Sequence, residues 1–111
     1  MEQGRNPTRR YPFFAHAELT EENSGTHATA RLCELSRKHC RLHVSKPSPV
    51  GTAVLVKIYA WPHFFQVHGT VCHSDSKFSL AIEFGEIEAQ YVSVLNACLL
   101  EIEKRGDRTV E

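Results

Sequence analysis

Hydrophobic and polar side chains alternate along six short segments within the first 84 residues. These segments are 13–20, 26–35, 40–44, 53–60, 64–72 and 78–84. Alternation with a period of two predicts strands that bury one face, and it is clearest where Phe78, Leu80, Ile82 and Phe84 share a side. Polar or Pro/Gly-rich turns separate the segments, as in EENSG (21–25) and KPSPVG (46–51). Short turns between consecutive strands indicate antiparallel pairing.

After Gly85 the period changes from two to about 3.6 residues. One helical stripe collects the apolar side chains of Ile87, Tyr91, Val94, Leu95, Cys98 and Ile102. This spacing predicts an amphipathic helix at the end of the chain. The sequence therefore predicts a mainly β fold, a small six-stranded antiparallel β-barrel with a C-terminal α-helix.

The length of 111 residues corresponds to one domain. The polar segment 1–12 contains Pro7 and Pro12 and is predicted to be a flexible N-terminal arm. We expect a single folded domain over 13–104 and a disordered tail over 105–111.

The chain carries 13 basic and 13 acidic side chains, so its formal net charge is zero. Zero net charge argues against nonspecific coating of DNA, RNA or an anionic membrane. The charges are unevenly distributed, with net +4 over 1–82 and net −4 over 83–111. Arg5, Arg9 and Arg10 lie within the first ten residues, and a cationic arm of this kind would suit a small anion.

No apolar run approaches the ~18–20 residues that a membrane span needs. The N-terminal sequence MEQGRNPTRR also lacks the apolar core of a signal peptide. We therefore expect a cytoplasmic protein without membrane insertion, whose four cysteines are reduced thiols.

Candidate catalytic and metal-binding residues are few. The densest group of potential ligands is Cys33, His39, Cys40 and His43, but it lacks the paired spacing of a zinc site, and Cys40 and His43 would project to opposite faces of a strand. Ser36 or a cysteine beside a histidine could serve as a nucleophile, yet no known nucleophile motif or phosphate-binding glycine loop surrounds any of them. The sequence predicts no metal, no cofactor and no enzymatic activity.

Two short motifs remain, RRYPF at 9–13 and ELSRKH at 34–39. In these two places the sequence resembles the PilZ domain of bacterial cyclic di-GMP receptors, which has an R-x-x-x-R motif before strand one and a D/N-x-S-x-x-G motif at the end of strand two. The resemblance covers roughly 9–100 and implies the PilZ-like split barrel. Phe13 stands where the family has its second arginine, Glu34 replaces Asp or Asn, and His39 replaces Gly.

The resemblance implies a receptor that binds cyclic di-GMP in a second-messenger signalling role. The implied ligand-binding residues are Arg9, Arg10, Glu34, Ser36 and His39, with Arg5 as a possible extra contact. Arginine suits this ligand because its planar fork binds phosphate or guanine oxygens and its flat face stacks on a purine. Binding would order the arm against the barrel and change the surface that an unidentified protein partner meets.

Two alternatives belong to other classes. A degenerate PilZ-fold module would bind a protein without the nucleotide, through the aromatic side chains of Tyr59, Trp61, Phe64 and Phe65, although these could also cap the open end of the barrel. General single-stranded nucleic-acid binding is disfavoured, because outside the arm the basic residues are scattered rather than arranged in a track.

Overall fold

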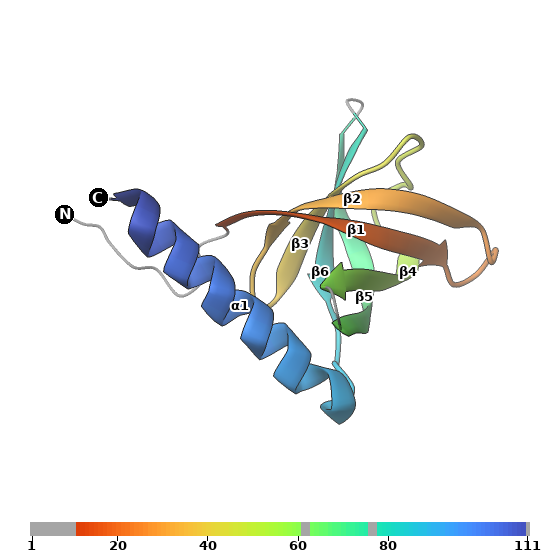
Figure 1. Cartoon of the computed structure of the whole chain (residues 1–111). Helices are drawn as coiled ribbons and strands as arrows, with labels where there is room; N and C mark the ends of the chain where they lie inside the picture. The colour runs from red at the N-terminus through yellow and green to blue at the C-terminus, as the bar shows by residue number, and fades with distance from the viewer. Residues whose placement is uncertain (1–10, 61–62, 76–77, 111) are drawn as a thin grey trace.

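The computed structural model describes the backbone of residues 11–60, 63–75 and 78–110, and the side chains of residues 15–60, 63–75 and 78–103. Six antiparallel strands close into a barrel in the order β1-β2-β3-β6-β5-β4, followed by one helix (Figure 1). The elements are β1 (Tyr11–Glu21), β2 (His27–Leu35), β3 (His39–His43), β4 (Ala53–Ala60), β5 (His63–Asp75), β6 (Ser79–Phe84) and α1 (Ala89–Val110). The predicted mainly β fold, a six-stranded barrel with a C-terminal helix, is confirmed.

The alternating apolar side chains fill the inside of the barrel. On β4, Val54, Val56 and Ile58 are fully buried, while the residues between them are half-buried. On β5, Phe65 is the largest fully buried side chain, and Val67 and Val71 follow it on the same face. The buried side chains of the six strands and the helix form one continuous core inside the closed barrel.

Strand β2 carries a bulge beside Cys33. The pairing of β2 with β3 passes from Leu32↔Leu42 to Glu34↔Arg41, so Cys33 has no partner of its own on β3. The extra residue resets the alternation, and Leu35 is buried although it follows the buried Leu32 by three positions. The bulge therefore adjusts the direction of the side chains at the end of β2, where the ELSRKH motif begins.

Helix α1 lies obliquely across one end of the barrel and contacts β5 and β1 (Figure 1). Its apolar stripe is the predicted one, because Leu95, Cys98 and Ile102 are buried. The helix extends to Val110, and the expected division into an arm, a domain over 13–104 and a tail over 105–111 stays a prediction. The apolar stripe ends at Ile102, the last buried residue among the described side chains of the helix. In the described part of the chain, no helix has the length and hydropathy needed to cross a membrane.

Phe78, which belongs to the clearest alternating pattern, is exposed rather than buried. Phe78 was expected to share the buried face of Leu80 and Ile82, but its side chain is 51% exposed. Its backbone has a φ of 68°, a value that bulky side chains rarely adopt. The alternation therefore starts only at Ser79, the first residue of β6.

Candidate functional site

Ser36 lies in the turn between β2 and β3, and its hydroxyl is used within that turn. The Ser36 Oγ accepts a hydrogen bond from the His39 backbone N–H (3.1 Å) and donates one to the His39 carbonyl (3.2 Å). The Ser36 backbone N–H also donates to the His39 carbonyl at 2.9 Å. Ser36 is only 5% exposed, so its first role is to shape the turn. The hydroxyl does not contact an imidazole, which removes the basis for a Ser–His nucleophile here.

We expect Ser36→Ala to lower the free energy of unfolding by about 1–2 kcal/mol. The substitution leaves the part-buried His39 N–H without its side-chain acceptor, and an unsatisfied donor of this kind costs about that much. The measurement is equilibrium urea denaturation, with Ser45→Ala as the control because Ser45 is exposed. Equal midpoints for the two variants would contradict the structural role of Ser36.

Hydrogen bonds to other elements also hold the 36–39 turn. Arg37 Nη1 donates to Asn96 Oδ1 of α1 at 2.9 Å, and the Phe84 backbone N–H donates to the Lys38 carbonyl at 2.8 Å. The turn is therefore tied to the helix on one side and to β6 on the other. Sites placed on rigid elements keep their geometry better than sites on free loops.

Glu34 stands on the outer side of β2, directly opposite Arg41 of β3. Its carboxylate lies 3.6 Å from Arg41 Nε, and Arg41 Nη1 donates to Ser79 Oγ at 2.9 Å. Arg41 is a residue that the sequence analysis missed. Its position could have been deduced, because the hairpin register across the 36–39 turn pairs residue 34 with residue 41.

Strand β1 begins beside the end of β2. Tyr11 pairs with Leu35, and Pro12 pairs with Glu34. Arg10 is covalently adjacent to Tyr11, and neighbouring Cα atoms are about 3.8 Å apart. Arg5, Arg9 and Arg10 themselves lie outside the described residues, as does the side chain of Phe13. The structure thus brings together the start of β1 and the Glu34–His39 motif.

All four cysteines are free, as predicted. Burial raises the pKa of the Cys40 thiol far above its usual range, with smaller contributions from Cys72 and Cys33 nearby, and burial also raises the pKa of Cys98. A thiol with a raised pKa is a poor nucleophile and a poor metal ligand at neutral pH. Cys40 is buried whereas His43 is exposed, so they face opposite sides as predicted. Within the described ranges, no three His, Cys, Asp or Glu side chains are placed to hold a metal ion.

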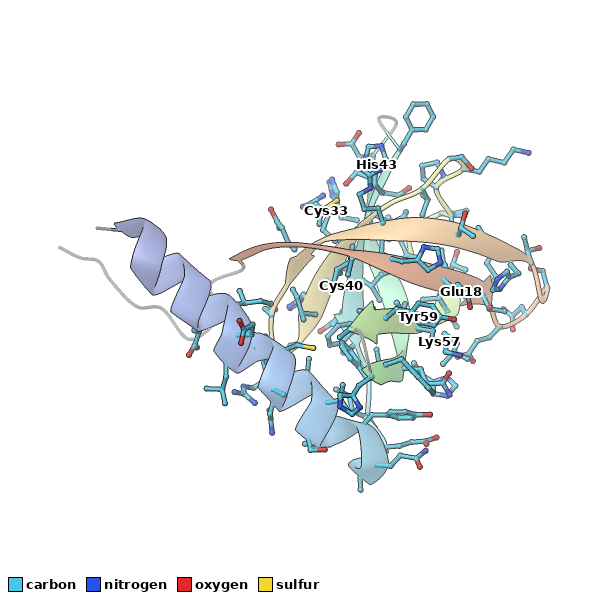
Figure 2. All side chains as sticks on the ribbon, in the orientation of Figure 1. Glu18, Cys33, Cys40, His43, Lys57 and Tyr59 are labelled. Atoms are coloured by element: carbon cyan, nitrogen blue, oxygen red, sulfur yellow. The ribbon has the colours of Figure 1, made fainter. Side chains whose placement is uncertain are left out.

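The predicted aromatic group divides between the core and the surface. Phe65 is fully buried, Phe64 is 39% exposed, and Trp61 lies outside the described residues. The Phe64 ring lies 6.3 Å from that of Tyr59 and 5.8 Å from that of Tyr91 on α1. Lys57 Nζ lies 4.3 Å from the centroid of the Phe64 ring and 5.2 Å from that of the Tyr59 ring. Figure 2 labels Lys57 and Tyr59 of this group. These contacts of Tyr59, Phe64, Tyr91 and Lys57 make an outer aromatic cluster where α1 meets β5, beside β4.

Comparison with known proteins gives a fold rather than a close relative. No protein-family model matches the chain, and no curated protein resembles it significantly in sequence. Among solved structures, the PilZ domain of CeSA from a cellulose-synthesizing bacterium aligns with a TM-score of 0.71 at 12% identity, covering 86% of this chain and 99% of that domain. The PilZ domain of YcgR from Escherichia coli, in a structure with c-di-GMP, aligns with a TM-score of 0.68 at 13% identity, covering 96% and 98%.

The chain therefore has the PilZ-like fold that its two short motifs suggested. Nearly the whole length of each solved domain is matched, so the likeness includes the barrel and the helix together. Both neighbours are described as PilZ domains, and at 12% and 13% identity the likeness concerns the fold. The absence of a family-model match agrees with the departures at Phe13, Glu34 and His39.

Proposed function

We propose that this protein is a cyclic di-GMP receptor domain of the PilZ type. The observation that carries the proposal is the register of β1 with β2, because Tyr11↔Leu35 and Pro12↔Glu34 bring the start of β1, which directly follows the arginine motif in sequence, beside the end of β2. The PilZ-like fold, shared with a domain whose structure contains c-di-GMP, supports the same ligand.

In the proposed site, the arm and the barrel contact different parts of the ligand. Arg9 and Arg10, with Arg5 as a possible extra contact, would bind the phosphates and stack on guanine. Glu34 would accept hydrogen bonds from a base edge, while Ser36 and His39 would shape the surface beneath it. Arg41, 3.6 Å from Glu34, adds a guanidinium beside the end of β2, and this chain has Phe13 in place of a second motif arginine.

Signalling would follow from the position of the arm. A ligand held by both Arg9–Arg10 and Glu34 would hold the arm against the end of β2 and change the surface that a protein partner meets. Because the 36–39 turn is tied to Asn96 of α1 through Arg37, ligand contacts at this turn would also reach the helix. In this proposal the domain acts in the cytoplasm, without cofactor, metal, DNA or RNA.

Isothermal titration with cyclic di-GMP tests the function. We expect saturable binding by the wild type and at least a hundredfold weaker binding by Arg9→Ala/Arg10→Ala, because two charge-assisted contacts of about 1.5–3 kcal/mol each are removed. The matched control is Lys46→Ala/Lys57→Ala, which removes the same charge elsewhere and should retain binding. No heat at high micromolar ligand, or equal affinity in all three proteins, would refute the proposal.

A second candidate function is contact with a protein partner in the absence of nucleotide. The outer aromatic cluster favours it, because Phe64 remains 39% exposed while it contacts Tyr59, Tyr91 and Lys57. Exposed aromatic side chains beside a cation are common at the centre of protein interfaces. A partner whose binding is lost with Phe64→Ala and is unchanged by cyclic di-GMP would support this candidate over the receptor.

A further inference from the structure

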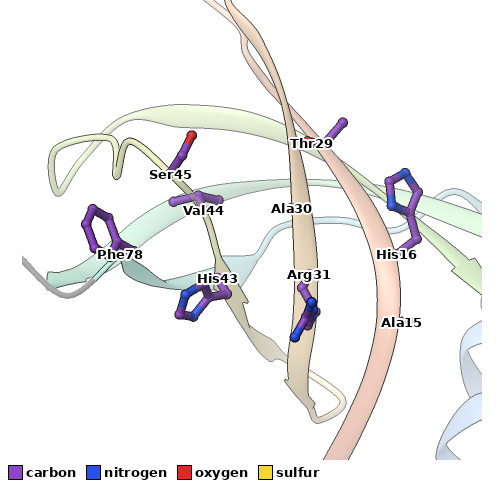
Figure 3. Close-up of a pocket in the computed structure, with 9 residues that line it drawn as sticks. All are labelled: Ala15, His16, Thr29, Ala30, Arg31, His43, Val44, Ser45 and Phe78. Atoms are coloured by element: carbon purple, nitrogen blue, oxygen red, sulfur yellow. The ribbon is translucent and has the colours of Figure 1, made fainter.

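An open hollow of about 860 Å³ lies on the side of the barrel between β2 and β3 (Figure 3). It begins where these strands stop pairing, because Arg31↔His43 is their last pair and the earlier residues of β2 pair only with β1. Nine residues line this β2–β3 hollow: Ala15, His16, Thr29, Ala30, Arg31, His43, Val44, Ser45 and Phe78. Ser36 and His39 are not among them.

The hollow has an apolar floor and a polar rim. Ala30 and Val44 are buried and form part of the floor, whereas His16, Arg31 and His43 are exposed. These three are directly opposite one another across β1, β2 and β3, in the register His16↔Arg31↔His43. Residues in direct cross-strand register share a face of the sheet. The barrel therefore presents a row of three nitrogen-bearing side chains at the hollow.

None of the nine lining residues is acidic. Among the described residues, no hydrogen bond or ion pair engages the Arg31 guanidinium, whereas Arg41 has Glu34 and Ser79, and Arg37 has Asn96. An exposed guanidinium between two imidazoles and above an apolar floor suits an anionic group.

Phe78 adds a flat apolar surface at the edge of the hollow. Its ring is 51% exposed, and its centroid lies 6.5 Å from that of His43. The backbone of Phe78 has a φ of 68° and is held by a hydrogen bond from the Val44 N–H to the Phe78 carbonyl. Neither local backbone preference nor core burial accounts for a phenylalanine here. A ring in this position can stack on a planar ligand.

We propose that the β2–β3 hollow is a second ligand site, separate from the arm, that binds a nucleoside monophosphate. The Arg31 fork holds the phosphate, the hydroxyls of Thr29 and Ser45 can add hydrogen bonds, and the base stacks on Phe78. At about 3.3 Å per strand residue, Arg31 lies roughly 10 Å along β2 from Glu34. The proposal does not depend on cyclic di-GMP binding at the arm.

The test is a titration followed by amide chemical shifts, with GMP, guanosine and inorganic phosphate as separate probes. We expect GMP to shift the amides of 29–31, 43–45 and 78, and to bind more tightly than either guanosine or phosphate alone. Arg31→Gln should weaken GMP binding by about tenfold or more, the loss expected for one charge-assisted contact. Phe78→Gly should weaken it about tenfold through lost stacking, while glycine tolerates the positive φ, so the fold is retained.

Two controls separate this site from the arm. Arg37→Gln removes an exposed arginine from the 36–39 turn, and Arg9→Ala/Arg10→Ala removes the arm pair; both should keep wild-type GMP affinity at the hollow. If inorganic phosphate binds with the same affinity as GMP, the hollow is a simple anion site and the nucleotide proposal is overturned. It would also be overturned by no GMP-dependent shift at the hollow up to about 10 mM, or by GMP affinity unchanged in Arg31→Gln. Cyclic di-GMP binding lost only with Arg9 and Arg10 would leave the receptor function standing in either case.

Discussion

Replacing Gly69 with alanine is expected to lower the free energy of unfolding by about 2–3 kcal/mol. Gly69 lies in β5 between Val54 of β4 and Phe84 of β6. A Cβ atom at this position would lie 2.6 Å from the Glu83 carbonyl oxygen and 2.7 Å from Cγ2 of Ile82. The first of these atoms belongs to the backbone of the neighbouring strand, so β5 and β6 would have to separate. Glycine is needed here for close approach of the two strands within the closed barrel.

The control is Gly85→Ala, where the nearest heavy atom to an added Cβ is the His68 carbonyl oxygen at 3.3 Å. We expect this variant to lose less than about 1 kcal/mol, because the neighbouring chain needs to shift by only a few tenths of an ångström. Chemical denaturation of both variants measures the difference. A Gly69→Ala protein as stable as Gly85→Ala would show that the β5–β6 contact is looser than the structure has it.

The six strands and the helix could be predicted from the sequence because each depends on local periodicity. The expected segment 53–60 coincides with β4, and the change of period after Gly85 marks the transition to the helix. Phe78 could not be predicted in this way. Its carbonyl accepts a hydrogen bond from the Val44 N–H, on a distant part of the chain, and no glycine or asparagine in the sequence indicates its positive φ.

The candidate site could be predicted only in part for a similar reason. Two motifs that are distant in sequence were expected to act together, and the pairing Pro12↔Glu34 brings the start of β1 to Glu34. The use of the Ser36 hydroxyl inside its own turn could not be deduced, since the same motif could present it to a ligand. The β2–β3 hollow was also missed, because it depends on where two strands stop pairing rather than on residue type.

We expect Phe65→Ala to destabilise the barrel by about 3–5 kcal/mol, the largest loss among the substitutions considered. Phe65 is fully buried and packs with the other inward side chains of the barrel, so its removal leaves a cavity in the single core. Loss of this size approaches the total stability of many small domains. Thermal unfolding followed by circular dichroism should show a greatly lowered midpoint or an unfolded protein.

The adjacent Phe64 provides the matched control, since it is the same residue type one position away on the opposite face of β5. Phe64→Ala should cost about 1 kcal/mol or less, because the ring is 39% exposed and its contacts are with Tyr59, Tyr91 and Lys57 at the surface. If Phe64→Ala destabilised the protein as much as Phe65→Ala, the outer aromatic cluster would be structural. If Phe64→Ala changes the free energy of unfolding only slightly, stability does not account for the exposed ring. That result is expected of a surface that binds a partner.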